Sequence, residues 1–418
     1  MFNLFLFLCL YLPFGIALNP TSGVDLASLR VLILGVFLFW LFAVWRKKEV
    51  AFKNNLETWL VVMFLFLNLL SIFATINMAW AARKLLYLFS IFPLYFVVSG
   101  LVKNRAQLFK TLAFLVLGGA LAAAIGLVQF FSQFLFGLAV VQKISARVAM
   151  FFLGRNFGME VLSNPSWFVN IGGKTYLRAV SFFPDPHMFA FFLGMIFPIA
   201  LGLGLFKDKK WLGAAGLVFA ADLLTFSRGG YIGLIAGVLF FGYICFQRAD
   251  KKATLVSGAF AAILTLALLL PGPVASRFDS SFNPDEGSNA GRLSMWETAE
   301  RIILTKPFLG VGIGNFSLAV DPNVNYRNSI YAHNTYLDVA VETGVPNALI
   351  WAGILLTAFL GLWKKTRKDL AYLGLTAAVM VFAVHSLADT ALYWPPDLAL
   401  VLIILALNNL PEKDEEVV

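Results

Sequence analysis

Residues 188–206 read MFAFFLGMIFPIALGLGLF, a run of 19 residues without a single charged side chain. A helix needs about 20 mostly apolar residues to cross the hydrocarbon core of a bilayer, so this run predicts a transmembrane helix. It follows FFPDPH, residues 182–187, in which two prolines prevent a regular helix before His187. The sequence therefore predicts a polar, irregular segment directly at one membrane surface.

The composition of the whole chain also indicates a membrane protein. Of its 418 residues, 60% are hydrophobic and 13% are charged, whereas a soluble globular chain is about half apolar and about one quarter charged. Both cysteines, Cys9 and Cys245, lie in apolar runs, which excludes a disulfide framework. Disordered, collagen-like and disulfide-rich classes are excluded, and a soluble enzyme is not expected.

Similar runs recur along the chain and predict an all-α polytopic membrane protein with twelve transmembrane helices. They lack the strict alternation of barrel strands. The first run lacks the basic flank and cleavage site of a signal peptide, so we expect a span there. The predicted spans cover residues 3–17, 28–45, 57–75, 85–102, 108–136, 188–206, 211–226, 230–246, 253–271, 346–363, 370–388 and 397–410.

Basic residues in the short loops predict the orientation, because cytoplasmic loops are enriched in Lys and Arg. One side, with the C-terminal tail, holds 18 of the 32 Lys and Arg residues: Arg46, Lys47, Lys48, Lys53, Lys103, Arg105, Lys110, Lys207, Lys209, Lys210, Arg248, Lys251, Lys252, Lys364, Lys365, Arg367, Lys368 and Lys413. The others lie mostly in two long segments, 137–187 and 272–345, which weigh little in this rule. We expect one integral membrane domain, residues 1–418, in a bacterial inner membrane. Both termini would be cytoplasmic, with 137–187 and the large loop 272–345 on the periplasmic face.

Two outer elements carry arginine. The segment 178–187 places Arg178, Asp185 and His187 at the membrane surface, although a polar turn leading into a helix would explain them as well. The turn TFSRGGY, residues 225–231, places Arg228 between two long apolar helices, where a charge usually pairs or binds a ligand. Gly229 and Gly230 would allow a ligand to approach the backbone. Asp222 is a candidate partner for Arg228, and snorkelling to the interface is the alternative.

The large loop holds further patterns. Ser294 to Glu297 has capping-box spacing and predicts the start of an amphipathic helix that ends at Pro307. The run GVGIGN, residues 310–315, lacks the strand–helix surroundings of a dinucleotide fingerprint and predicts a turn, with a phosphate site as the alternative.

His333 is the candidate base. Residues 334–343 predict a helix that ends at Gly344 and Pro346, so His333 lies at the helix N-terminus. The positive end of a helix dipole favours the neutral imidazole, which can accept a proton, and it also suits an anion such as a diphosphate. A structural histidine is the alternative, and the outward position beside two arginines favours catalysis.

Metal and nucleic-acid sites are not predicted. There are only three histidines, and Asp279, Asp285 and Glu286 fit a solvated loop. We therefore expect no metal and no cofactor. The net charge of +9 suits an anionic lipid surface or an anionic substrate. A Ser-His-Asp triad stays open, although no nucleophile elbow is present.

Together these elements resemble the O-antigen ligase family, which shares its sequence pattern with the O-antigen polymerases. The spacing agrees from about residue 60 to 390, and one departure is His187, where the family more often has Asn. The matching pieces are Arg178 with Asp185-Pro186, Ser227-Arg228-Gly229, the glycine turn 310–315, and His333-Asn334-Thr335-Tyr336-Leu337 followed by Glu342-Thr343-Gly344.

The resemblance implies a GT-C-like, metal-independent glycosyltransferase that takes a glycan from undecaprenyl diphosphate in the periplasm. A ligase transfers it to a sugar hydroxyl of lipid A-core, and a polymerase to another lipid-linked repeat unit. By the same resemblance, Arg178 and Arg228 would bind the diphosphate, and His333 would act at the acceptor hydroxyl or the phosphate. Asp185, Ser227, Asn334 and Tyr336 would support them.

The chemistry of the residues agrees with this implication. Breaking a sugar–diphosphate bond leaves negative charge, and arginines offer forked donors that stay charged. A hydroxyl that attacks from the opposite face inverts the anomeric centre. A ligase is preferred to a polymerase because we expect no appended soluble domain. A transporter would place ionisable residues near the midplane, where Asp222 is the clearest charge, and a structural membrane protein would not need two arginines and a histidine.

Overall fold

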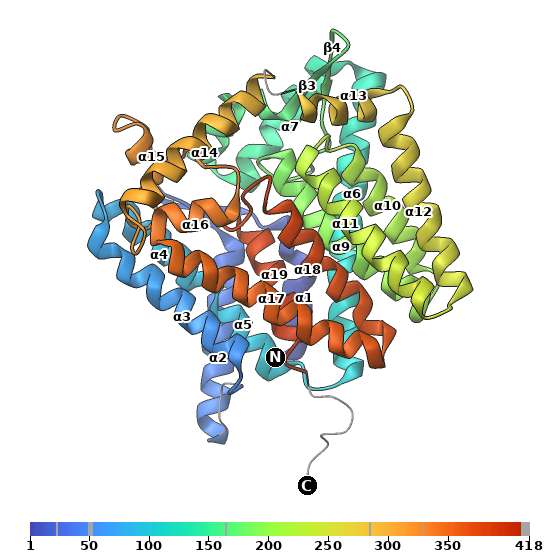
Figure 1. Ribbon diagram of the computed structural model, residues 1–418, viewed down its shortest axis with the longest axis horizontal. Coiled ribbons are helices and arrows are strands. Elements are labelled where there is room, and N and C mark those ends of the chain that lie inside the picture. Colours follow the sequence, from blue (N-terminus) through green and yellow to red (C-terminus); the bar gives the residue numbers. More distant parts are fainter. Residues whose placement is uncertain (22–23, 49–52, 164, 284–285, 328, 411–418) are drawn as a thin grey trace.

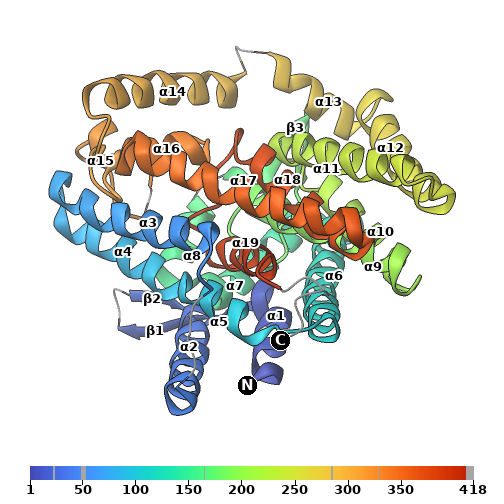
Figure 2. The ribbon, with the colours of Figure 1, turned by 60° about the horizontal axis from the view of Figure 1, so that its bottom comes forward.

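The structure of the protein, a computed structural model, describes residues 1–21, 24–48, 53–163, 165–283, 286–327 and 329–410. Lys413 and Asp285, on which two of the sequence arguments draw, lie outside these residues. The regular secondary structure of the described part is helical apart from two antiparallel hairpins (Figures 1 and 2). The hairpins pair β1 (Ala17–Thr21) with β2 (Val24–Ala27) and β3 (Phe168–Ile171) with β4 (Lys174–Leu177).

The α-helices follow one another along the chain, with short 3₁₀ turns between some of them. They are α1 (Phe2–Tyr11), α2 (Ser28–Lys47), α3 (Leu56–Leu70), α4 (Met78–Ile91), α5 (Pro93–Leu101), α6 (Arg105–Phe136), α7 (Leu138–Leu153), α8 (Arg155–Ser163), α9 (Pro186–Phe206), α10 (Trp211–Leu223), α11 (Arg228–Gln247), α12 (Lys251–Leu269), α13 (Pro273–Asp279), α14 (Gly287–Thr305), α15 (Phe316–Val320), α16 (Thr335–Thr343), α17 (Val345–Lys368), α18 (Leu373–His385) and α19 (Pro395–Leu407).

Each of the twelve predicted spans coincides with an apolar helix, but they differ in length. Among the described residues, eight helical segments are long and apolar enough to cross a membrane. The other four, Phe2–Phe14, Trp211–Leu223, Leu370–His385 and Pro395–Leu407, are shorter. The structure therefore supports a polytopic membrane protein with eight full-length spans, and the expected count of twelve is not confirmed.

The centre of the molecule is built from helices that are apolar all round. Every residue of α19 is buried, and α9 is buried along most of its length. α9 packs against α6, α10, α11 and α18, and α19 lies in the middle of the bundle (Figure 2). A helix without a polar face must be covered on all sides, which explains these central positions. By contrast, α2 and α12 expose most of their apolar side chains at the periphery, as lipid-facing helices do.

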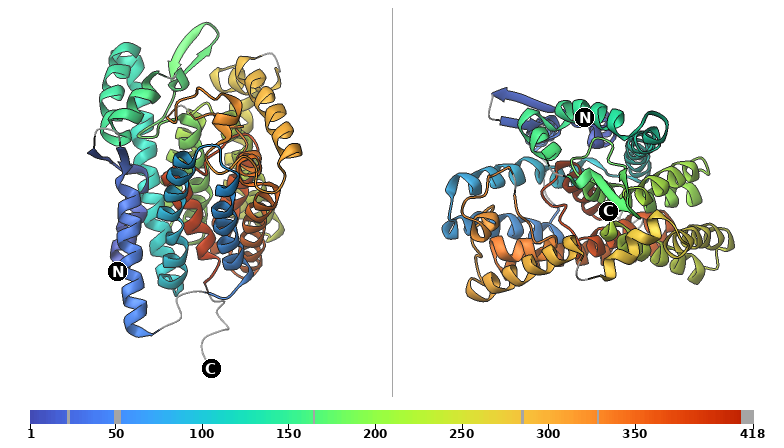
Figure 3. Two further views of the ribbon diagram at one scale, coloured as in Figure 1. Left: turned by 90° about the vertical axis from the view of Figure 1, so that its left-hand side faces the viewer. Right: turned by 90° about the horizontal axis from the view of Figure 1, so that it is seen from above.

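The two long polar segments gather at one end of the molecule. In the left panel of Figure 3, α7, α8, the β3–β4 hairpin, α13 and α14 lie at the top. The described residues of 137–187 and 272–345 therefore share one face, on which the site is built.

The first long helix of the large loop begins earlier than its sequence suggests. α14 starts at Gly287, and the Glu286 carboxylate caps it by accepting a hydrogen bond from the Asn289 amide at 3.2 Å. The predicted start at Ser294 is wrong, because Glu286 supplies the cap about two turns upstream. The predicted end before Pro307 is confirmed, since α14 stops at Thr305.

The glycine run 310–315 is a buried turn that fastens the large loop to the membrane helices. The Val311 amide donates to the Val341 carbonyl at 2.8 Å, and the Ile313 amide donates to the Ser71 hydroxyl at 3.2 Å. The Asn315 amide oxygen accepts from the Asn77 amide at 2.6 Å. These contacts confirm a turn, and since its backbone groups bond to protein, they do not support a phosphate site.

Gly312 in this turn tolerates no side chain. Its φ is +88°, and a Cβ there would lie 2.4 Å from the Thr75 Cα. We expect Gly312→Ala to destabilise the protein by about 2 kcal/mol or more, from left-handed strain plus overpacking. Thermal unfolding in detergent measures this. The matched control is Gly291→Ala within α14, where nothing lies within 4 Å and the change should stabilise by about 0.5 kcal/mol. Equal unfolding temperatures for the two variants would contradict the packing argument.

Candidate active site

His333 stands at the N-terminus of α16, as the sequence predicts. Asn334 caps the helix with its side-chain oxygen, which accepts from the Tyr336 amide at 3.0 Å and the Leu337 amide at 3.1 Å. His333 itself has a left-handed backbone, with φ of +50°. The preceding residue is fixed on both sides: the Ala332 amide donates to Asp338 at 2.7 Å, and the Trp296 indole donates to the Ala332 carbonyl at 2.7 Å. The imidazole is therefore carried on a rigid turn.

Asp389, between α18 and α19, joins three cationic or ionisable side chains. Its Oδ1 lies 2.9 Å from the His333 Nδ1. Its Oδ2 lies 3.1 Å from Arg292 of α14 and 3.2 Å from the Nδ1 of His187. The carboxylate is buried, and the positive charges around it hold the pKa of Asp389 well below its usual range despite burial. Asp389 is thus an ionised residue at the centre of the site.

The helix N-terminus alone would favour a neutral His333 imidazole, but Asp389 favours the protonated form. Burial lowers the pKa of the His333 imidazole, but the hydrogen bond and the charge of Asp389 outweigh it and raise the pKa above the ordinary value. The side chain is 45% exposed, and within the described residues its Nε2 has no hydrogen-bond partner. With Nδ1 bonded to Asp389, Nε2 is the atom left to exchange a proton with a substrate.

Arg178 is buried with one donor group unused. Its Nε donates to the Thr225 carbonyl at 2.6 Å, and its Nη1 donates to the Ser166 carbonyl at 3.1 Å. Nη2 is buried without a partner in the described part of the chain. Burial lowers the pKa of Arg178 to about 10, opposed by Asp185 and reinforced by Arg277, so the guanidinium stays charged at neutral pH. A buried, charged and unpaired donor is costly unless a ligand completes it.

Arg228 lies at the start of α11 and bonds to the large loop. Its Nη1 lies 3.0 Å from Glu286 and 3.3 Å from the Ser280 carbonyl. Arg277 of α13 lies 3.3 Å from the other oxygen of Glu286. The predicted partner, Asp222, is wrong: both its oxygens are buried without a partner among the described residues.

Gly229 and Gly230 serve helix packing rather than ligand access. A Cβ at Gly229 would lie 2.8 Å from the His385 ring, and one at Gly230 would lie 2.9 Å from the Ala190 Cβ. His385 itself is buried and stacked on Phe191, with ring centroids 3.5 Å apart. These contacts set the position of the first turn of α11, and therefore of Arg228.

The remaining predicted site residues have structural partners. Asp185 caps α9 by accepting from the His187 amide at 2.6 Å, and burial raises its pKa although Arg178 opposes the shift. The Tyr336 hydroxyl donates to the Ala383 carbonyl at 2.9 Å, and the Asn334 amide donates to the Leu387 carbonyl at 3.1 Å. Both therefore dock α16 on the end of α18.

The serine, histidine and aspartate of this region do not form a catalytic triad. The Ser227 hydroxyl lies 2.9 Å from the His187 Nδ1, which is the same nitrogen that faces Asp389. A triad needs opposite ring nitrogens for the serine and the acid. Ser227 is also fully buried and caps α11 through the Gly230 amide at 3.2 Å.

Sequence reasoning missed four charged residues of the site: Arg277, Glu286, Arg292 and Asp389. Together with Arg178, Arg228 and Asp185 they make four guanidinium groups against three carboxylates on one face. A diphosphate would find an excess of positive charge here. The overlooked signal was Asp389, an acid directly after an apolar span, where an unpaired charge is expensive.

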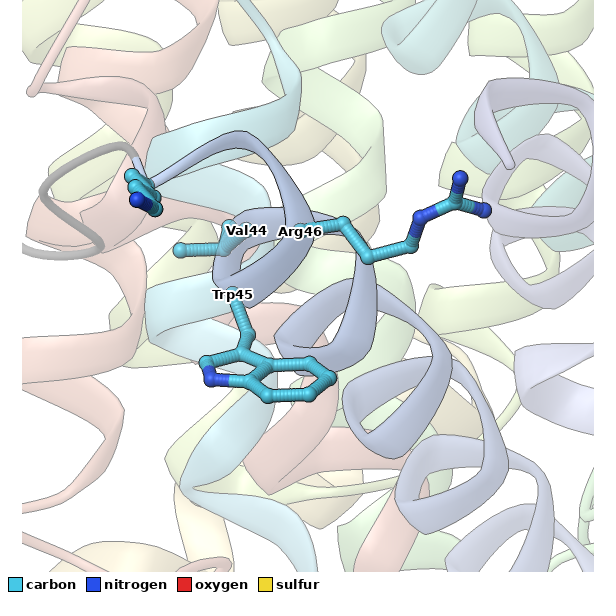
Figure 4. Close-up of a pocket in the computed structure, with 4 residues that line it drawn as sticks. Val44, Trp45 and Arg46 are labelled. Carbon is cyan, nitrogen blue, oxygen red and sulfur yellow. The ribbon is translucent and has the colours of Figure 1, made fainter.

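Other candidate sites in the described residues are weaker. No group of three or more His, Cys, Asp or Glu side chains is arranged to hold a metal ion within them. A pocket at the C-terminal end of α2 is lined by Val44, Trp45, Arg46 and Lys48 (Figure 4). It contains no residue of the arginine–histidine cluster.

Part of the chain, including several residues of this site, is similar in sequence to known proteins. A sequence model described as O-antigen ligase matches residues 212–352, which include Arg228, Glu286, Arg292 and His333. The chain is also 26% identical over 193 residues to the exopolysaccharide production protein ExoQ of Rhizobium meliloti (strain 1021). That alignment covers 41% of this chain and 43% of ExoQ, so the chain spans less than half of this curated relative. These matches agree with the resemblance noted in the sequence: residues 212–352 are similar to the O-antigen ligase family, and part of the chain is similar to an exopolysaccharide production protein.

Proposed function

We propose that the protein is a membrane glycosyltransferase that moves a glycan from undecaprenyl diphosphate to a sugar hydroxyl of lipid A-core. The reaction would proceed without metal and with inversion, on the periplasmic face of the inner membrane. The observation that carries this proposal is the unpaired Nη2 of Arg178, buried in a cluster of arginines that also holds the Asp389–His333 pair. One part of the cluster suits an anionic leaving group, and the other suits a hydroxyl that must lose a proton.

The residues divide the reaction between them. As the acceptor oxygen bonds to the anomeric carbon, the bond from that carbon to the diphosphate oxygen breaks, and its electron pair stays on the diphosphate. Arg178, Arg228 and Arg277 would stabilise that charge in a buried setting, where such donors act strongly. The His333 Nε2 would take the hydroxyl proton, and Asp389 would stabilise the imidazolium that results. Arg292 and His187 hold Asp389 in position.

Reconstitution with a lipid-linked glycan and a separate lipid A-core acceptor tests the proposal. Glycan found on lipid A-core is the expected result. If the glycan instead lengthens on undecaprenyl diphosphate, the protein is a polymerase, a second candidate favoured by the relative named for exopolysaccharide production. Accumulation of lipid-linked glycan inside sealed vesicles, with no covalent product, would overturn the enzymatic proposal in favour of transport.

Glu286 provides a prediction about donor binding. Burial raises its pKa, but Arg228 and Arg277 outweigh this and lower it, so the carboxylate is ionised and occupies both arginines. A diphosphate must compete with it. We expect Glu286→Gln, whose amide oxygen can still cap α14, to lower the donor KM up to about fivefold, the range of a partly exposed ion pair. Steady-state kinetics measure this, with Asp279→Asn in the same loop as the matched control. A raised KM would show that Glu286 instead positions the arginines.

A further inference from the structure

A second cationic surface lies beside the site, built from α2, α4 and the loop before His333. We name it the aromatic–arginine surface and define it by Arg30, Trp80, Arg83, Tyr87 and Tyr326. The Tyr326 ring packs edge-on against Trp80, with centroids 5.1 Å apart, and the Arg83 guanidinium lies 4.9 Å from the Tyr326 centroid. Arg30 lies 5.4 Å from the Tyr87 centroid. Two arginines are thus held against aromatic rings on one surface.

The two arginines differ in how much of their hydrogen-bonding capacity is used. Arg30 donates to the Ser90 hydroxyl at 2.7 Å and to the Leu86 carbonyl at 3.1 Å, which anchors it. Arg83 is exposed and makes no hydrogen bond or ion pair within the described residues. A cation held over a ring face keeps its N–H groups at the edge available. Arg83 therefore presents a positioned fork of donors.

No carboxylate in the described residues pairs with this surface. Glu342, an acid that acts electrostatically on Tyr326, is ion-paired with Lys84, whose Nζ lies 2.6 Å from it. Lys84 also lies 3.4 Å from the centroid of Tyr393. Both residues of the ion pair are largely buried, at 12% and 5% exposed. The surface consequently keeps its positive charge for a partner from outside the chain.

The chain connects this surface to the candidate base. Tyr326 lies seven residues before His333, and Tyr331 between them stacks on Tyr393, with centroids 5.9 Å apart. Trp80 and Arg83 lie in the first turns of α4, whose capping residue Asn77 bonds to Asn315 of the glycine turn. The aromatic–arginine surface therefore borders the same loop that carries His333.

We propose that the aromatic–arginine surface binds an acidic sugar of the acceptor glycan. This inference rests on the proposed function and adds the chemical class of the acceptor. A guanidinium fork matches a carboxylate or phosphate group, and the half-buried Trp80 and Tyr326 rings offer apolar faces and edges to the C–H face of a sugar ring. A phospholipid headgroup shares the negative charge but lacks the ring that the aromatic residues would contact.

The test measures binding without donor. The purified full-length protein in phosphatidylcholine nanodiscs is titrated with trigalacturonic acid and with its trimethyl ester, which keeps the rings and removes the charge. We expect the acid to bind, with an affinity that falls as salt rises, and the ester to bind at least about tenfold more weakly, as for the loss of a charged hydrogen bond. Arg83→Gln should weaken binding of the acid by about tenfold. Trp80→Ala should weaken both ligands, and Trp80→Phe should restore part of the loss.

The matched control is Arg105→Gln, which removes an arginine paired with Asp369 at 2.9 Å at the start of α6 and should not change binding. Equal affinity for acid and ester, or an unaltered affinity in Arg83→Gln, would overturn the inference. A higher unfolding temperature of the protein in phosphatidylglycerol nanodiscs, without any binding of the sugar acid, would also overturn the inference, because it would identify a site for a lipid headgroup. A protein that binds the acid but transfers no glycan would contradict the proposed function alone.

Discussion

Arg178→Ala is expected to lower kcat for glycan transfer by about 10²–10³-fold, as for the loss of a preorganised donor to a developing negative charge. Two of the guanidinium nitrogens are fixed on the Thr225 and Ser166 carbonyls, so the unpaired Nη2 has a fixed direction. Under the proposed function, this already desolvated group would need no reorganisation when the diphosphate departs. The measurement is the single-turnover rate with lipid-linked glycan and acceptor in reconstituted vesicles.

Two further variants make this expectation specific. Arg178→Lys keeps the charge but cannot reach both carbonyls and the ligand at once, so its rate should lie between wild type and alanine. Arg155→Ala removes an exposed arginine at the start of α8 and should leave the rate unchanged. Wild-type turnover in Arg178→Ala, with unaltered thermal unfolding, would remove Arg178 from the leaving-group site.

His333→Ala is expected to lower kcat by about 10²–10⁴-fold, the usual contribution of a general base. Asp389→Asn should cause a smaller loss, because the imidazole remains but its orienting carboxylate does not. Asp389→Glu keeps the charge and should recover part of that loss. A His333→Ala protein that is folded and fully active would show that another group accepts the proton.

The pH profile distinguishes catalysis from a structural role. A base acts in its unprotonated form, so wild-type kcat/KM should fall as pH decreases through the raised pKa of His333. In Asp389→Asn the group that raises this pKa is gone, so the acidic limb of the profile should move to lower pH while the maximum falls. A purely structural Asp389 would lower the maximum without moving the limb.

Local sequence patterns predicted many of the helices in the fold. Apolar runs located the helices of the twelve predicted spans, and Gly344 with Pro346 marked the end of α16, which runs from Thr335 to Thr343. Hydropathy did not separate full-length spans from short buried helices, because a helix inside a bundle is as apolar as one in lipid. The start of α14 was misplaced because a glutamate cap has a weaker signature than Ser or Thr.

The candidate site was predictable where its residues lie within motifs and hidden where they meet only in space. Arg178, Arg228 and His333 stand beside prolines, glycines and a helix cap, which mark them in the sequence. Asp389 lies 56 residues from His333 and Glu286 lies 58 from Arg228. Such pairings depend on how α14, α18 and α19 pack, which periodicity does not reveal.

The shortness of α19 has a consequence for where lipid and water meet. Its 13 residues extend about 20 Å, at about 1.5 Å each, whereas the hydrocarbon core is about 30 Å thick. Its C-terminal end is fastened beside Lys365, whose Nζ bonds to the Leu410 carbonyl at 2.5 Å. α19 alone is therefore about 10 Å too short for a full crossing, and Asp389 lies in the non-helical segment that precedes it. Under the proposed function, this missing length of helix is where a lipid-linked donor and the acceptor sugar would meet.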